Sequence, residues 1–434
     1  MNHAPLTRRS FAKQTGFAAM AAAPAVQALG ANERIQLGMI GLGGRGSHHL
    51  RQLITHDSLA SQCKIVALAD PDMRHVRRNQ ERLGHQAQAV QDFRKVLDNP
   101  DVDAVYISTP DHWHAIMTIL ACQAGKDVYV EKPMTHTIEE ALRVLDCEAQ
   151  TGRVIMVGQQ QRSQRQFQRI VERIQQGDIG SVNAVRCLNM WGMTDYLSEP
   201  LLDPGDKPIP PEVDYDLWLG PAPERPFSPA RFHVNFYFFL DYSGGMITGW
   251  GVHLFDIVMW AMGPTLRGAY LHGGKFVYND LRDTPDTAEM IFDAPDYTFS
   301  YLVRHGNGFP HDPREGNIDH GIYFYGEEGT ALVNRRHAKI YPEPDMAPVE
   351  TIEGGGGDIE HKQNFFDCIR SRNKPVCPPE DGFYANLPGQ LAIISWQLKR
   401  HVAWDPEERT IPHDDQARAL MSRDYRAPWT LPEV

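Results

Sequence analysis

The chain has 434 residues, 42% of them hydrophobic and 23% charged, and its formal net charge at pH 7 is −12. Because a single domain usually has about 100 to 200 residues, this length predicts two domains, and the composition is that of a folded globular protein. An acidic surface repels phosphate backbones and anionic lipids, which argues against nucleic acid or membrane partners and favours a neutral small molecule.

The first thirty residues resemble a twin-arginine export signal. Arg8 and Arg9 in TRRSFAK precede the mildly apolar GFAAMAAAPAVQALGA, which is shorter than the roughly 20 residues that span a bilayer and ends in small residues suited to cleavage. We therefore expect residues 1–30 to be a signal peptide and the mature protein to be periplasmic or secreted. The alternative is a disordered basic N-terminus. Since the twin-arginine route carries folded proteins, an exported chain can keep a cofactor that it bound in the cytoplasm.

A glycine-rich turn follows a short apolar segment at 35–40. The order is strand, Gly41-x-Gly43-x-x-Gly46 and a segment able to start a helix. In dinucleotide-binding folds the first glycine permits a tight turn, the second lets the backbone approach the pyrophosphate, and the third lets helix and strand pack closely. The residues expected to contact the cofactor in this loop are Gly41, Gly43, Gly44, Arg45 and Gly46.

The next apolar run ends at Asp70, which is expected to accept hydrogen bonds from the ribose hydroxyls of the cofactor. A carboxylate there repels the 2′-phosphate of NADP, so NAD is the predicted cofactor and NADP is disfavoured. Arg74 lies close enough in sequence to weaken this preference.

Apolar strands alternate with helices up to residue 155. The predicted strands AVYISTP, DVYVEKP and VIMVG are separated by the predicted helices HAIMTILACQAGK and TIEEALRVLDCEAQTG. Strands that are apolar throughout and joined by helices indicate a parallel sheet covered on both faces. The sequence therefore predicts a Rossmann domain over residues 32–155.

Residues 156–434 have a different texture. Amphipathic stretches such as VNAVRCLNMW and TAEMIFDAPDYTFSYLV, with glycine turns and proline-rich connections, indicate strands and helices mixed. The predicted fold class is α/β: an N-terminal Rossmann domain and a C-terminal α+β domain built on a mostly antiparallel open sheet. After the loop EGGGGDIEH, a helix near 360–375 is expected to pack back on the first domain.

Neither the cysteines nor the histidines predict a metal site. The six cysteines are scattered without a CxxC pair and are interpreted as small core residues rather than as a disulfide framework. His112 and His114 flank a tryptophan without a third ligand nearby.

Three stretches carry candidate chemistry near strand ends, where open parallel sheets bind their ligands: STPDHWHA, VEKPMTHT and GGMITGWGVHLFD. In the second, Lys132 directly follows an apolar strand. A lysine beside the nicotinamide and away from bulk water can have a lowered pKa and share a proton with a substrate hydroxyl. The alternative for an isolated lysine at such a position is a solvated surface residue.

The motifs GLGGRG, STPDHWH, EKP and GGMITGWGVHLFDIVMW, in this order and spacing, resemble the Gfo/Idh/MocA family, the group of glucose-fructose oxidoreductase and inositol dehydrogenase. The resemblance covers nearly the whole chain after the signal. It implies a Rossmann domain followed by an α/β domain whose open sheet often forms an oligomer interface, so a homo-oligomer, dimer or tetramer, is expected. It also implies that Lys132 and His253 are the catalytic residues and flank the substrate carbon at the nicotinamide.

Further site residues follow from the same motifs. Besides the glycine loop and Asp70, the expected cofactor contacts are Pro110, His114, Glu131, Lys132 and Pro133. The expected substrate contacts are Lys132, Arg162, Tyr237, Trp250 and His253. Tyr237 and Trp250 belong to an aromatic-rich part of the second domain, where rings can stack on sugars or fill the core.

One position departs from the family pattern. The last motif usually reads Asp-x-Gly-x-His, whereas this chain has Gly249-Trp250-Gly251-Val252-His253. The missing carboxylate puts an ordinary Lys-Asp-His dehydrogenase site in doubt. His253 remains a candidate acid or base because the unperturbed pKa of histidine lies near neutrality. The alternative for His253 is a hydrogen-bonded core residue.

Three functions are consistent with the sequence. The first is an exported NAD-dependent oxidoreductase that moves a hydride from a carbinol carbon of a sugar or sugar derivative to tightly bound nicotinamide. The second is an NAD-dependent glycoside hydrolase or lyase that works by transient oxidation, elimination, water addition and re-reduction. The third, which the glycine at position 249 favours, is a cofactor-bound sensor without turnover.

Overall fold

The computed structural model describes residues 34–191, 201–203, 205, 207–309, 311–312, 315, 319–345 and 347–434. The predicted signal peptide lies outside the described residues. In the described part of the chain, no helix is both long and apolar enough to cross a bilayer.

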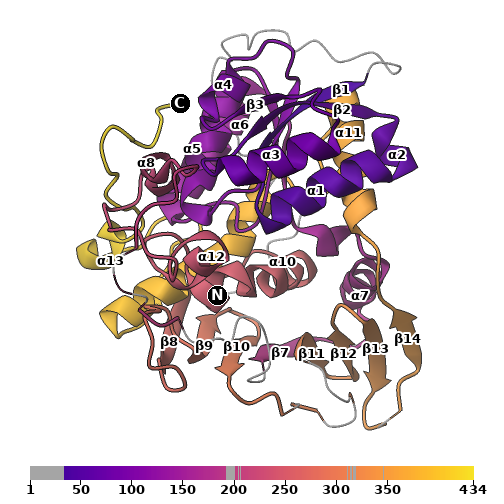
Figure 1. Ribbon diagram of the computed structural model, residues 1–434. Coiled ribbons are helices and arrows are strands. Elements are labelled where there is room, and N and C mark those ends of the chain that lie inside the picture. Colours follow the sequence, from indigo (N-terminus) through magenta and orange to yellow (C-terminus); the bar gives the residue numbers. More distant parts are fainter. Residues whose placement is uncertain are drawn as a thin grey trace.

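Six short apolar strands form the centre of the N-terminal domain (Figure 1). All pair in parallel, in the order β3-β2-β1-β4-β5-β6. The strands are β1 Ile35–Ile40, β2 Cys63–Ala69, β3 Gln88–Val90, β4 Ala104–Ile107, β5 Asp127–Val130 and β6 Ile155–Val157. The connecting helices are α1 Gly44–Thr55, α2 Asp57–Ala60, α3 Met73–Arg82, α4 Arg94–Leu97, α5 His114–Gln123 and α6 Ile138–Thr151. This is the predicted Rossmann domain.

Local sequence signals explain where its helices begin and end. Helix α6 starts at a capping box in which the Thr137 hydroxyl accepts from the backbone of Glu140 and the Glu140 carboxylate accepts from the backbone of Thr137. It ends at Gly152, which has a left-handed backbone conformation. The apolar helix α5 is buried on nearly all sides because it contacts both β5 and α6.

A nine-stranded sheet organises the C-terminal domain, in the order β14-β13-β12-β11-β7-β10-β9-β8-β15. Among the described strands of this sheet only β7 and β10 pair in parallel, so the sheet is mostly antiparallel, as predicted. The strands are β7 Val182–Trp191, β8 Gly268–Gly274, β9 Thr287–Asp293, β10 Thr298–His305, β11 His320–Gly326, β12 Gly329–Val333, β13 His337–Pro342, β14 Glu350–Glu353 and β15 Val402–Ala403. The helices are α7 Arg165–Gln176, α8 Tyr215–Leu219, α9 Gly245–Gly249, α10 Gly251–Met262, α11 Asp358–Ser371, α12 Pro379–Leu398 and α13 Asp415–Ala419.

Helices α7, α10 and α12 lie between this sheet and the Rossmann domain (Figure 1). They cover the inner face of the sheet, where alternate residues of β9 and β10 are buried. The opposite face carries a small apolar cluster that includes Leu188, Met190 and Tyr323. The layered arrangement holds the start of α10 against the end of the Rossmann sheet.

The helix α11 returns to the first domain and completes its core. Phe365 and Phe366 belong to the same apolar cluster as Leu37 and Met39 of β1. The last Rossmann strand, β6, runs to Val157, two residues beyond the predicted boundary at 155. The N-terminal domain is therefore built from two separate parts of the chain.

Candidate functional site

The glycine turn leaves an open cradle at the start of α1. Gly41 has φ +82°, and a Cβ there would lie 2.6 Å from the backbone of Ser108. A Cβ on Gly46 would overlap the carbonyl oxygen of Gly41. By contrast, Gly43 and Gly44 face open space, with nothing closer than 3.8 Å to an added Cβ. Tight packing below and free backbone above are what a pyrophosphate at a helix N-terminus requires.

Asp70 stands beside this turn and holds it. Its carboxylate accepts hydrogen bonds from the backbone nitrogens of Leu42 at 2.7 Å and Asp72 at 2.9 Å. The guanidinium of Arg74 is bound to Asp72, with Nη2 2.6 Å from a carboxylate oxygen. Arg74 is therefore engaged by Asp72, which reduces its ability to attract a 2′-phosphate.

A cavity of about 730 Å³ runs along the carboxyl ends of the Rossmann strands. Its wall contains the predicted cofactor contacts Gly41, Gly43, Gly44, Arg45, Asp70, Pro110, Glu131 and Lys132 together with Tyr237. The second domain contributes other residues to the same wall, among them Trp218, His233 and Phe236. Ser108 and Thr109 also line it, and their hydroxyl oxygens are buried without a hydrogen-bond partner among the described residues. These unsatisfied groups and the glycine cradle fit a dinucleotide.

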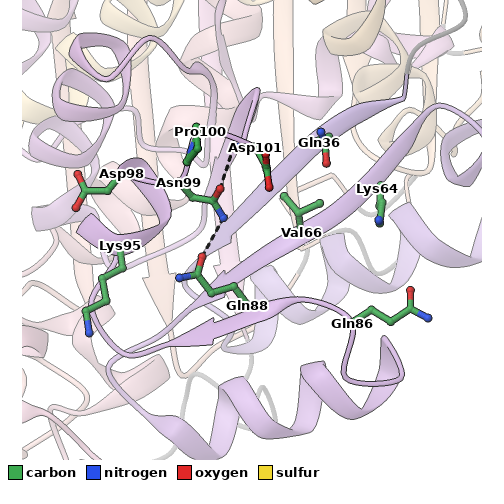
Figure 2. A pocket seen from close by; sticks show the side chains of 10 residues that line it. All are labelled: Gln36, Lys64, Val66, Gln86, Gln88, Lys95, Asp98, Asn99, Pro100 and Asp101. Atoms are coloured by element: carbon green, nitrogen blue, oxygen red, sulfur yellow. Dashed lines mark hydrogen bonds between the residues drawn. The ribbon is translucent and has the colours of Figure 1, made fainter.

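A second hollow in the Rossmann domain lies near the opposite ends of the strands (Figure 2). Gln36 and Lys64, near the starts of β1 and β2, belong to its lining. Figure 2 shows its polar groups bonded to one another: Asn99 donates to Gln88 at 2.9 Å and accepts from the backbone of Asp101. Open parallel sheets bind ligands at the carboxyl ends of their strands, so this hollow is not the candidate site.

Glu131 ties the glycine loop to the end of β5. One carboxylate oxygen accepts from Arg45 Nε and from His49 Nε2, both at 2.8 Å, and from Gln160 at 3.1 Å. Burial would raise the pKa of Glu131, but Arg45 and His49 outweigh it and hold the pKa well below its usual value. Glu131 is therefore an ionised anchor rather than an acid.

Lys132 lies at the junction of two cavities. It lines both the larger one and a neighbouring cavity of about 600 Å³. Its Nζ donates to the carbonyl oxygen of Gly249, the last residue of α9, at 2.8 Å. Burial lowers the pKa of Lys132, although Glu131 and Asp111 oppose the shift. A lysine of this kind can exchange a proton near neutral pH more readily than a solvated one.

Tyr237 occupies the space that a side chain at position 249 would need. A Cβ added to Gly249 would lie 2.6 Å from the hydroxyl oxygen of Tyr237 and would overlap its ring. Tyr237 belongs to the short helix His233–Phe238 of the second domain and lines the larger cavity beside Lys132. The carboxylate absent from position 249 is thus replaced by a main-chain carbonyl and a phenol.

His253 and Trp250 line the smaller cavity together. His253 is 4% exposed, and its Nδ1 has no hydrogen-bond partner among the described residues. Burial lowers its pKa well below the usual value, and Arg335 and Lys132 lower it further. His253 is therefore neutral at physiological pH.

The structure places two predicted cofactor contacts, His114 and Pro133, behind the cavity walls. His114 is 1% exposed, and its ring nitrogens bond to the carbonyls of Pro133 at 2.7 Å and Thr109 at 2.9 Å. Neither His114 nor Pro133 lines the two cavities; both support the strand end that carries Lys132.

Arg162, expected as a substrate contact, lies inside the second domain and outside both cavity walls. It is 5% exposed and pairs with Asp256 at 2.8 Å and Asp381 at 2.6 Å. Asp381 is more than 200 residues away from Arg162 in the sequence, so the spacing of the motifs could not predict this ion pair. Arg162 is therefore held in a buried ion-pair network and does not reach either cavity wall.

The chain matches two family models. The NAD-binding Rossmann model of the Gfo/Idh/MocA oxidoreductases matches residues 35–159, and their C-terminal alpha/beta model matches residues 196–266 and 327–431. The chain belongs to the Gfo/Idh/MocA oxidoreductase family. It is an NAD-dependent oxidoreductase, and both predicted domains of that family are present.

Individual relatives of this oxidoreductase are distant. A myo-inositol 2-dehydrogenase of Thermotoga maritima is 22% identical over 85% of this chain and 98% of its own length. The scyllo-inositol 2-dehydrogenase (NAD(+)) of Bacillus subtilis is 26% identical over 79% of this chain and 88% of its own. A levoglucosan dehydrogenase solved with NADH superposes with a TM-score of 0.66 at 17% identity, covering 86% of this chain and 99% of that one. The last likeness supports the fold.

Sequence reasoning missed several residues of the oxidoreductase site. Arg335 lines the smaller cavity but comes from the turn after β12, outside every motif. His75 and His233 line the cofactor cavity, and their ligand atoms and one of Asp72 all lie within 4.8 Å of one another. Since Arg74 already occupies the Asp72 carboxylate, this cluster stands as a polar contact between the domains.

Proposed function

We propose that this oxidoreductase oxidises a carbinol carbon of a sugar or sugar derivative, with Lys132 as the proton acceptor. The observation that carries the proposal is the position of Lys132, which lines both the cofactor cavity and the neighbouring cavity. When bound in the larger cavity, NAD accepts a hydride. The substrate therefore belongs in the smaller cavity, with its hydroxyl beside Lys132.

The proton leaves the hydroxyl as the hydride leaves its carbon. The lowered pKa of Lys132 provides a neutral amine, which becomes an ammonium when it takes the proton. The carbonyl of Gly249 stabilises that ammonium through the hydrogen bond from Nζ. Neutral His253 and the phenol of Tyr237 orient the hydroxyl. Two of the relatives named above are inositol dehydrogenases, which supports a polyhydroxylated substrate.

A second candidate is the hydrolase or lyase that uses NAD transiently. Residues of the second domain, including Leu217, Trp218 and Val234, wall the cofactor cavity. Such walls slow cofactor exchange and favour a reaction that returns NAD to its starting state. Oxidation of a ring hydroxyl acidifies the neighbouring C–H, a glycosidic substituent leaves, water adds, and the ketone is reduced.

The nucleotide test separates these candidates. The protein is purified without added nucleotide, denatured, and the released cofactor identified; intact protein is then offered sugars and aryl glycosides while nicotinamide absorbance is followed. Stable NADH with a sugar supports net oxidation, whereas cleavage of a glycoside with NAD unchanged at the end supports the transient route. Binding without either result supports the sensor.

Export and assembly are further proposals. The twin-arginine resemblance of residues 1–30 supports a periplasmic or secreted enzyme, which cell fractionation tests. A homo-oligomer is supported by the outer face of the nine-stranded sheet, where Ile291 is 58% and Tyr270 39% exposed. Light scattering of the purified protein distinguishes a monomer from a dimer or tetramer.

A further inference from the structure

Arg335 projects its charge into the smaller cavity. Its guanidinium lies over the ring of Trp250, 4.6 Å from the centroid, and its Nε donates to the side chain of Gln161 at 3.2 Å. The Trp250 ring and Gln161 fix the plane of the guanidinium. No carboxylate of the described residues forms an ion pair with it.

Four other arginines of the described chain, each with at most about a fifth of its side chain exposed, pair with a carboxylate. The pairs are Arg162 with Asp256, Arg282 with Asp280, Arg372 with Asp127 and Arg423 with Glu140. A guanidinium withdrawn from water without a counter-ion is unfavourable. Unlike these four, Arg335 lines a cavity and has no carboxylate within ion-pair distance among the described residues.

The acids around the cavity are already engaged. Glu131 binds Arg45 and His49, and Asp358 lies 3.3 Å from His48 and 3.7 Å from Arg45. A third acid, Glu360, accepts from the backbone of Gly357, and Asp319, further off, binds His320.

Two basic side chains, Lys132 and Arg335, therefore face the cavity without a paired carboxylate. Lys132 donates to a main-chain carbonyl. Burial lowers the pKa of Arg335, and Arg335 in turn lowers the pKa of Lys132 and of His253. These groups oppose one another's charge, and an anion placed between them relieves the opposition.

We propose that the smaller cavity binds a sugar that carries a carboxylate, with that carboxylate on Arg335 and a hydroxyl beside Lys132. A planar guanidinium matches a carboxylate through two parallel hydrogen bonds. One unpaired guanidinium suits a single negative charge better than a phosphate dianion. The inference rests on the proposed function, because it places the reacting hydroxyl at Lys132, and it replaces the neutral substrate expected from net charge.

Calorimetric titration of the NAD-loaded protein tests the anion site. The probes are D-glucuronate and D-galacturonate, their neutral partners D-glucose and D-galactose, and glucose 6-phosphate. We expect at least one uronate to bind about tenfold or more tightly than its neutral partner. Equal binding of acid and neutral sugars, or tighter binding of the sugar phosphate, overturns the proposal.

Variants assign the preference to Arg335. Arg335→Gln is expected to weaken uronate binding about 10- to 100-fold and leave the neutral sugar unchanged. Arg335→Lys, which keeps the charge but loses the planar fork, retains part of the preference and serves if the first variant does not fold. The matched control, Arg336→Gln at the exposed neighbouring position, leaves binding unchanged. An undiminished uronate preference in both Arg335 variants contradicts the proposal.

Failure of the anion site is separable from failure of the redox function. Arg335-dependent uronate binding without any change in nicotinamide absorbance supports the site and contradicts oxidation at Lys132. If a neutral sugar is oxidised at the same rate by the parent and by the Arg335 variants, the result supports oxidation at Lys132 and contradicts the anion site.

Discussion

The side-chain nitrogen of Lys132 lies 2.8 Å from the carbonyl oxygen of Gly249. At the position where the family pattern has an aspartate, the partner of Lys132 is therefore a main-chain carbonyl. The neighbouring volume is filled by Tyr237, which leaves no room for a side chain at 249. The glycine is therefore part of a fitted arrangement, and it does not by itself indicate a site without chemistry.

Gly249→Ala is expected to lower kcat/KM about 10- to 100-fold, because the new methyl group displaces Tyr237 and shifts the carbonyl that holds Lys132. Steady-state kinetics on a reactive sugar measures the loss. Tyr237→Ala makes room for the methyl group, so the double variant should lose less than the two single losses combined. Strictly additive losses contradict this fit.

Lys132→Met is expected to lower kcat about 100- to 10,000-fold and to leave NAD bound. In the parent enzyme the neutral amine is the active form. Activity should therefore rise with pH through a pKa below 10.5, the ordinary value for lysine, and then level off, because burial lowers the pKa of Lys132. His253→Asn serves as the control and keeps this limb of the pH profile. If the rise of activity with pH persists in Lys132→Met, another group is responsible for it.

Asp70→Asn is expected to raise the ratio of NADP to NAD use, measured as kcat/KM, about tenfold. The amide keeps an acceptor for the backbone of Leu42 but no longer repels a 2′-phosphate. Arg74→Ala is the matched control: since Asp72 already binds Arg74, its loss should change the ratio little. An unchanged ratio in Asp70→Asn removes this residue from cofactor choice.

Arg162→Met is expected to lower the free energy of unfolding by roughly 3 to 5 kcal/mol, because it leaves Asp256 buried without its partner. Urea denaturation measures the loss, and Arg162→Met/Asp256→Leu should recover much of it. At temperatures where the variant is folded, KM should equal that of the parent. A raised KM in the folded variant restores Arg162 as a substrate contact.

Lys362→Met is expected to stabilise the protein at neutral pH. Lys362 is fully buried, and burial lowers its pKa to about 8, although Asp358 opposes the shift. Since the unfolded chain holds this proton more tightly, the parent gains stability as pH rises from about 8 to 10.5, by roughly 3 kcal/mol.

The variant lacks this dependence, so its advantage is present at pH values below about 8 and disappears as pH approaches the ordinary lysine value. Urea denaturation at several pH values checks the convergence. Lys374→Met, at an exposed lysine, is the control and should show no such trend.

Local patterns predicted the parts of the site that lie next to one strand end. The glycine spacing gave the cradle, and the apolar run before Lys132 gave its place at the end of β5. Contacts between residues far apart in the sequence could not be predicted from these local patterns. Tyr237 and Gly249 meet because the short helix His233–Phe238 lies beside α9, and Arg335 enters the cavity from the turn between β12 and β13. The aromatic count suggested Tyr237 as a contact but not the space it fills.

Helix α11 places Phe365 against Tyr106 and Tyr129 in the first domain, with ring centroids 5.7 and 5.8 Å apart. As a ribosome synthesises a chain from its N-terminus, the first domain emerges long before this helix. Until most of the chain has been synthesised, the sheet of the first domain therefore lacks α11 and keeps an apolar surface exposed. Nascent chains truncated before α11 should accordingly depend on chaperones, and stable cofactor capture comes only near the end of synthesis.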